Sequence, residues 1–139
     1  MIAQHLRALL TAALPDTTVL LPEQVQEPLS GGRPGQPGGL RAYLAQHAGG
    51  YVQVGRPVGI DASLTVTTWH PITTLAPDEA TCHALAQQVL TALCGTPGRA
   101  PGQFARVLYA PPTTDTPGVW TSTLTVRAVT LDGALIPGA

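Results

Sequence analysis

Histidine and cysteine, the residue types that most often bind metal ions or act as nucleophiles, are few in this chain and widely spaced. The four histidines are His5, His47, His70 and His83, and no two of them have the spacing of metal ligands. Cys82 and His83 are adjacent, and neighbouring side chains on a helix point about 100° apart, so they cannot simply share one ion. The sequence therefore predicts no metal site.

Nucleophilic catalysis is not indicated either. The chain has no Gly-x-Ser-x-Gly motif, and Cys82 is the thiol placed in the first turns of a predicted helix. The helix dipole there could lower the pKa of a thiol, but Cys82 also falls on the apolar stripe of the helix, where burial raises the pKa instead. We expect Cys82 to be a core residue and assign no catalytic residue.

The glycine-rich and acidic segments have structural explanations. Segment 30–39 holds five glycines, but Pro34 and Pro37 remove amide donors and no lysine follows, so a phosphate-binding loop is not expected. Asp78-Glu79 suits the start of a helix, where acidic side chains complement the helix dipole. Glu23 and Glu27 fall in a predicted loop. The sequence thus predicts no organic cofactor and no enzymatic activity.

Two tryptophans are candidates for contacts with other proteins. Trp69 and Trp120 lie among threonines in predicted strands, and large aromatic side chains are enriched at protein interfaces. The alternative is that each plugs the end of a sheet or packs under a helix. The complete set of candidate interface residues adds four others, which are Tyr51, Arg33, Arg56 and Arg127.

Composition limits the classes of partner. The chain has 139 residues, 44% of them apolar, which is enough for one core, and only 4% are aromatic. Seven arginines, no lysine and eight acidic residues give a net charge of −1, without the basic excess that nucleic-acid binders usually show. His5 and Arg7 interrupt the first apolar run, and no window approaches the ~20 apolar residues of a membrane span. We expect a soluble protein without a standard export signal.

Two helices are predicted. Apolar residues recur at helical spacing from Ile2 to Leu14, and Pro15 ends that pattern. The second helix begins near Pro77 and ends at Gly95, with Cys82, Ala86, Val89 and Leu93 on one stripe, broadened by Leu85 and Leu90. Cys82 and Cys94 would lie about 18 Å apart along it, whereas a disulfide needs Cα atoms within about 7 Å. An intramolecular disulfide is therefore not expected.

The remaining segments read as strands and loops. Strands are predicted at Thr17–Leu21, Tyr51–Val54, Ala62–Trp69, Phe104–Ala110 and Val119–Val129. Pro111–Gly118 is predicted to be a rigid turn. Residues 24–49 are predicted to be a flexible loop that contains a short helix at Leu40–Ala48. Residues 132–139 are predicted to be a loose tail with few anchors. In the last strand, Trp120, Ser122, Leu124, Val126 and Ala128 alternate with polar residues. The order predicts one α+β domain over 1–139, with two main helices on one face of a mostly antiparallel sheet.

This order of elements resembles the tail-terminator proteins of long-tailed phages, also called tail-completion or minor tail proteins. The resemblance rests on "YVQVG", "ASLTVTTWHP", "APDEATCHALAQQVLTALCG" and "GVWTSTLTVRAV", which cover residues 51 to 130, and more loosely on the amino-terminal helix. In that family a strand ending near a tryptophan leads into an alanine-rich amphipathic helix, and two strands follow. The sequence departs from the family in its extended 24–49 region.

The resemblance implies a structural viral protein of siphophage tails, located in the virion at the head-proximal end of the tail and in the host cytoplasm during assembly. Such proteins form a homo-oligomeric ring, commonly a hexamer, on the last ring of the tail tube. The ring ends tube polymerisation and offers a surface for head attachment. The implied partners are copies of the chain, the tail-tube protein and the head–tail connector protein, with no membrane and no sequence-specific nucleic acid.

Three other interpretations stay open at this point. A head–tail joining (neck) protein would copurify with portal or capsid rather than with tail tubes. A small enzyme or ligand-binding domain would bring scattered residues such as Asp61, His70, Arg106 and Arg127 together in a deep pocket. The third is an oligomeric bacterial domain unrelated to phage.

Overall fold

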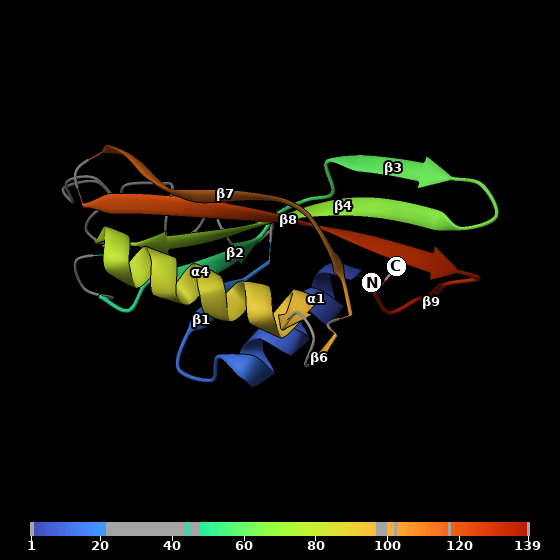
Figure 1. Cartoon of the computed structure of the whole chain (residues 1–139), viewed down its shortest axis with the longest axis horizontal. Helices are drawn as coiled ribbons and strands as arrows, with labels where there is room; N and C mark the ends of the chain where they lie inside the picture. Colours follow the sequence, from blue (N-terminus) through green and yellow to red (C-terminus); the bar gives the residue numbers. More distant parts are fainter. Residues whose placement is uncertain are drawn as a thin grey trace, which may run out of the picture.

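The computed structural model describes residues 2–21, 44, 48–96, 100–101, 103–116 and 118–138. In this part of the chain two helices lie on one face of a seven-stranded sheet (Figure 1), which confirms the predicted α+β class. The helices are α1 (Ile2–Ala13) and α4 (Glu79–Cys94). The strands of the sheet are β1 (Thr18–Leu20), β2 (Tyr51–Val54), β3 (Gly59–Ala62), β4 (Val66–Ala76), β7 (Ala105–Thr116), β8 (Val119–Leu131) and β9 (Ala134–Leu135). Two short strands, β5 (Gly95–Thr96) and β6 (Ala100–Pro101), pair with each other.

The strand order in the main sheet is β1-β2-β4-β8-β7. β1 runs parallel to β2, and the other described pairs are antiparallel, so the sheet is mixed. β2 pairs with the second half of β4 and β3 pairs with its first half. β2 and β3 therefore follow each other along one side of β4, while β8 occupies the other side.

Helix α4 begins and ends at the residues that the sequence favours. Asp78 is its N-cap, since Oδ1 accepts a hydrogen bond from the Thr81 backbone N–H at 2.8 Å and Oδ2 accepts one from the Thr81 hydroxyl at 2.9 Å. These bonds hold the pKa of the Asp78 carboxyl below its ordinary value. At the other end Gly95 adopts φ of 75°, a conformation that favours glycine. The predicted stripe is buried at Cys82, Leu85, Ala86, Val89 and Leu93, while its sixth residue, Leu90, is half-buried.

The main core lies between the two helices and the sheet. Helix α1 contributes Leu6 and Leu10, which are fully buried, and α4 contributes Val89 and Leu93. The predicted alternation in β8 is confirmed from Ser122 to Ala128, because the even-numbered residues are buried and the odd-numbered residues are half-buried. The even-numbered face of β4 is buried in the same way at His70, Ile72 and Thr74. These residues define the helix-bearing face of the sheet.

The prediction of one continuous strand over Ala62–Trp69 is wrong. β3 ends at Ala62 and β4 begins at Val66, so residues 63–65 connect two strands of a hairpin, and the Ser63 N–H donates to the Thr65 carbonyl at 2.9 Å. The connection has no glycine, proline or asparagine to mark a turn, and its alternating threonine and apolar residues have the pattern of a strand. The face assigned to Leu64 was therefore wrong as well.

The prediction of a turn over Pro111–Gly118 is also wrong, because β7 continues to Thr116. β7 is the outermost strand of the described sheet on its side, so proline there removes no donor from an inner ladder. Register shifts between Ala110 and Thr113, and again between Thr113 and Thr116, accommodate the two prolines.

The carboxyl-terminal residues have more backbone hydrogen bonds than the sequence suggested. β9 pairs with the end of β8, the Ile136 N–H donates to Val129, and the Gly138 N–H donates to Gln103 at 2.9 Å. Asp132 and Gly133, between β8 and β9, both have positive φ, 51° and 82°. Asp-Gly is a frequent sequence for such a two-residue hairpin turn, and this signal was missed.

The predicted 24–49 loop and the predicted 40–48 helix lie outside the described residues except at Leu44, Ala48 and Gly49. Leu44 is helical and fully buried. It belongs to a second, smaller apolar cluster with Tyr51, Leu75 and Val119. Leu75 alternates with Thr74 along β4, which places this cluster on the face opposite the helices.

Replacing Gly50 by alanine is expected to destabilise the fold. Gly50 has φ of +78°, and an added Cβ would overlap the Leu75 carbonyl oxygen. The expected loss is about 2 kcal/mol in the free energy of unfolding, measured by chemical denaturation. Gly49→Ala is the matched control, because nothing lies within 4 Å of its added Cβ. We expect it to stay within about 0.5 kcal/mol of the original chain. Equal stabilities of the two variants would contradict the described turn.

Candidate interaction surface

Trp69 and Arg127 are cross-strand neighbours on the face of the sheet opposite the helices. Register places Gly59 of β3, Trp69 of β4 and Arg127 of β8 side by side. Trp69 is half-buried, and a Cβ added at Gly59 would lie 3.1 Å from Cε3 of its ring. The indole therefore lies over Gly59, which has no side chain to compete for this space. The structure brings together these two of the predicted interface residues.

The other predicted interface residues are dispersed. Trp120 pairs with Ala76, seven residues along β4 from Trp69, which is about 24 Å at the rise of a strand. Arg56 is exposed in the break between β2 and β3. Arg33 lies outside the described residues.

Tyr51 does not lie on the surface. Its side chain is fully buried, and its hydroxyl accepts a hydrogen bond from Gln53 Nε2 at 2.7 Å. Because Tyr51 pairs with Leu75 at the buried second cluster, its predicted role as an interface residue of this chain is wrong. An aromatic residue at the start of a strand gave no indication of which face would be covered.

Among the described residues, the largest group of exposed apolar side chains lies on the hairpin formed by β3 and the first part of β4, and the sequence did not predict it. Its exposed fractions are 92% for Leu64, 71% for Ile60, 71% for Val58 and 37% for Val66. The hairpin extends beyond both helices, at the right of Figure 1. Ile60 is paired with Thr68, and Val66 lies two residues before Thr68, so both belong to the helix-bearing face. Neither α1 nor α4 lies over this part of the face, and they are the helices of the described residues.

A second exposed apolar pair lies on β7, at the opposite edge of the described sheet. Val107 is 47% exposed and Leu108 is 63% exposed. The register with β8 shifts between Arg106 and Leu108, so Val107 is the extra residue of a bulge. Arg106 beside them is exposed.

The four residues considered for a scattered active site do not meet. His70 is buried on the helix-bearing face, whereas Asp61, paired with Thr67, and Arg127, paired with Trp69, belong to the opposite face. Arg106 is paired with Val126 and thus lies on the helix-bearing side. Within the described residues, no three His, Cys, Asp or Glu side chains are close enough to hold a metal ion.

His70 is a polar residue within the core. Its Nε2 and the Thr68 hydroxyl are 2.8 Å apart in a hydrogen bond, and its Nδ1 is buried without a hydrogen-bond partner among the described residues. Burial lowers the pKa of the imidazole below its ordinary value of 6.5, because the charged form is poorly solvated there. Burial therefore favours the neutral form of the His70 imidazole in the folded chain.

The two cysteines are free, and Cys82 is buried as predicted. Its thiol donates to the Thr74 carbonyl oxygen, with the sulfur 3.7 Å from that oxygen. Burial, with a smaller contribution from the Asp78 charge, raises the pKa of Cys82 from 9.0 to about 11. Burial also raises the pKa of Cys94, against the opposing charge of Arg106. Neither thiol has the depressed pKa of a reactive cysteine.

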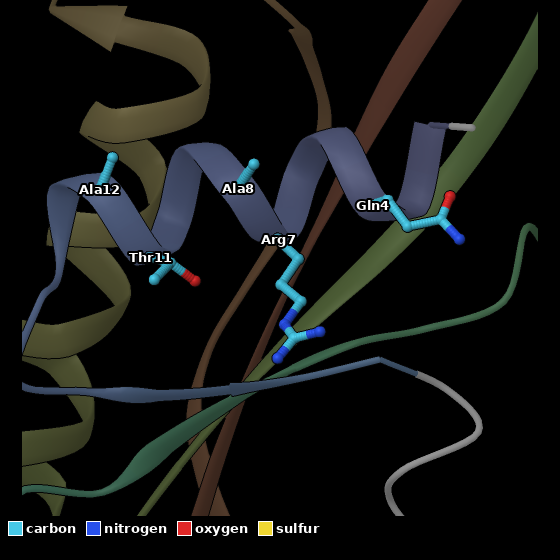
Figure 2. Close-up of a pocket in the computed structure, with 5 residues that line it drawn as sticks. All are labelled: Gln4, Arg7, Ala8, Thr11 and Ala12. Carbon is cyan, nitrogen blue, oxygen red and sulfur yellow. The ribbon is translucent and has the colours of Figure 1, made fainter.

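A shallow hollow of about 490 Å³ lies on the outer side of α1 and is lined by Gln4, Arg7, Ala8, Thr11 and Ala12 (Figure 2). Arg7 extends from the helix in the direction of the neighbouring strands, while Ala8 and Ala12 point to the other side (Figure 2). Ligand sites usually combine an apolar pocket with several convergent polar groups. The five lining residues do not provide that combination.

No protein-family model and no curated protein sequence matches this chain. Neither described helix has the length and hydrophobicity needed to cross a membrane.

The stability of the chain should decrease in mild acid because of His70. The folded-state pKa lies below 6.5, so the unfolded chain binds a proton at a pH where the folded chain does not. The free energy of unfolding is then highest above pH 6.5 and decreases as the pH falls below that value. Denaturant titrations between about pH 8 and about pH 5 measure this dependence. His70→Gln should flatten the dependence, whereas the exposed control His83→Gln should keep it. The same slope in His70→Gln and the original chain would contradict this role.

Cys82 should be nearly inert towards thiol reagents in the folded chain. In a Cys94→Ser variant, which isolates this thiol, a pKa of about 11 in place of 9.0 lowers the thiolate fraction. The reaction with a disulfide reagent at about pH 8 should be about 100-fold slower than in the unfolded chain. Equal rates in the two states would show that the thiol is exposed.

Proposed function

We propose that this chain is a structural subunit that assembles with copies of itself into a ring on the end of a phage tail tube. The ring ends tube polymerisation and presents a surface for the head–tail connector. The resemblance of residues 51–130 to tail terminators supports this role, and so does the arrangement of the sheet. The observation that carries it is the apolar β3–β4 hairpin, which extends beyond the two described helices and is covered by no described element.

The hairpin favours assembly because its apolar side chains are in contact with water, and burying them would lower the free energy. Burying a large aliphatic side chain stabilises a protein by about 1.5–3 kcal/mol relative to leaving it in water. Leu64, Ile60 and Val58 are each more than two-thirds exposed, and they are close together in the sequence. Contiguous exposed apolar patches in soluble proteins mark contact surfaces more often than they mark solvent-facing structure.

A closed ring has a further requirement, which the chain meets. Each subunit must present two different surfaces, so that one copy binds the next in a single direction and the rotation closes. The hairpin and β7 form opposite edges of the described sheet, and both carry exposed apolar residues. A net charge of −1 leaves little general repulsion between copies.

The proposal is tested with the purified chain and tail tubes polymerised from the tube protein of the same genome. Sedimentation velocity and negative-stain microscopy should show rings, either of the chain alone or on tube ends, and adding the chain should stop tube growth. A chain that stays monomeric at high concentration and leaves tube growth unchanged would contradict the proposal. Binding to portal rings but not to tubes would also contradict it, in favour of a neck protein.

A further inference from the structure

We propose that Asp132-Gly133, the turn between β8 and β9, is a site of spontaneous isoaspartate formation, and that this modification releases β9 from β8. Both residues are exposed. They join Leu131 of β8 to Ala134 of β9, which form the last pair of this ladder. The proposal goes beyond the structural role above and does not depend on ring assembly.

The reaction requires the two residues and water. The backbone nitrogen of Gly133 attacks Cγ of Asp132, an N–Cγ bond forms, and a carboxyl oxygen leaves as water, which gives a cyclic succinimide. Water then adds to the former main-chain carbonyl carbon of Asp132, and the bond from that carbon to the Gly133 nitrogen breaks. The chain now continues through the Asp132 side chain. The water that is lost is regained, so the mass of the chain does not change.

The surroundings of the turn leave room for this attack. A Cβ added at Gly133 would have nothing within 4 Å outside the adjoining residues, so the attacking nitrogen is crowded neither by a side chain of its own nor by other elements. Within the described residues, the Asp132 carboxyl has no hydrogen-bond or ion-pair partner that would hold it away from this nitrogen. The carboxyl is therefore free to approach the backbone.

The native turn slows the reaction but does not prevent it. Asp132 has φ of 51° and Gly133 has φ of 82°, as in a closed two-residue hairpin turn. Ring closure requires rotation about the Cα–C bond of Asp132, which the paired strands restrain. However, β9 has two residues, of which Ala134 is exposed and Leu135 is half-buried. A strand with so few buried contacts opens locally at a small cost in free energy.

Isoaspartate does not fit this turn. It adds a carbon atom to the main chain, whereas the register of a hairpin depends on the length of its loop. β9 then loses its pairing with β8. Ile136 and Gly138 follow β9, and their N–H groups donate to the carbonyl groups of Val129 at 2.8 Å and of Gln103 at 2.9 Å. We expect both hydrogen bonds to be lost.

The effect should stay at this end of the chain. Gln103, which accepts the hydrogen bond from Gly138, keeps a side-chain hydrogen bond of 2.7 Å to His5 Nε2. The next residue, Phe104, is buried in the main core, and its N–H donates to the Leu93 carbonyl at 3.1 Å. These contacts do not involve β9, so the modified chain should remain folded.

The modification is measured in the full chain after several weeks at neutral pH. Trypsin cleaves after Arg127, and the peptide Ala128–Ala139 then contains Asp132 as its one acidic residue. We expect a second chromatographic form of this peptide with unchanged mass, which accepts a methyl group from an isoaspartyl methyltransferase. The peptide that contains Asp61 and Asp78 is the internal control. Both are followed by residues with side chains, and this peptide should accept no methyl group.

Equal methyl labelling of the two peptides would overturn the proposal. Labelling of Ala128–Ala139 only when the chain is incubated in denaturant would overturn it as well, because the folded turn would then protect Asp132. Asp132→Asn provides an independent check. Asn-Gly suits the same turn and forms the same succinimide with loss of ammonia, so the peptide should gain mass faster than the original peptide isomerises.

Release of β9 is tested by hydrogen–deuterium exchange after the same incubation. In the modified fraction, the Ile136 and Gly138 amides should exchange at least about fivefold faster, which corresponds to the loss of one hydrogen bond each. Exchange within α4 should not change. Asp132→Gly is the matched control, since Gly-Gly also suits a two-residue hairpin and has no carboxyl group. Isoaspartate with unchanged exchange at both amides would show that β9 stays paired and would contradict the proposal.

Discussion

Eleven residue pairs join β4 to β8, from Val66 with Thr130 to Ala76 with Trp120, and this antiparallel ladder organises the chain. β2 and β3 add to one side of it, and β7 and β9 add to the other. Successive side chains of a strand point to opposite faces of the sheet, so Ile72, Leu124 and Val126 point towards the helices and the intervening threonines point to the other face. The ladder is longer than the described helices packed on it, and neither of these helices covers the β3–β4 hairpin.

His70 lies where the helix cover ends. It is the last buried residue of the helix-bearing face before Thr68 and Val66, which are progressively more exposed. Its hydrogen bond to the Thr68 hydroxyl satisfies one ring nitrogen, and the other remains buried without a described partner. A neutral imidazole can occupy this boundary position because one nitrogen faces a polar neighbour and the carbon edge of the ring tolerates the core.

Local signals predicted the helices and most strands well. The Asp78 cap, the apolar stripe of α4 and the glycine at 95 act over a few residues, so the sequence alone indicates where that helix begins and ends. The hairpin at residues 63–65 and the extension of β7 through Pro111 and Pro112 were not predictable in the same way. Each depends on which strand lies at an edge and what it pairs with, which is a tertiary property.

Candidate interface residues are harder to choose from the sequence for a related reason. Residue type singled out aromatic and arginine side chains, yet Tyr51 is buried and Trp69 lies over Gly59. The exposed apolar residues of the hairpin resemble core residues in sequence, and only the end of the helix cover shows that they are exposed. An alternation of apolar residues therefore does not show by itself whether another element of the chain covers that face.

Hydrogen–deuterium exchange at low and high protein concentration examines directly whether another copy covers the hairpin. We expect exchange over residues 59–66 and over residues 105–110 to slow together as the concentration rises, while exchange within α4 stays the same. The sample must be shown to have assembled at the higher concentration. If exchange in both segments is then the same at the two concentrations, the hairpin stays in contact with solvent and no neighbouring copy covers it.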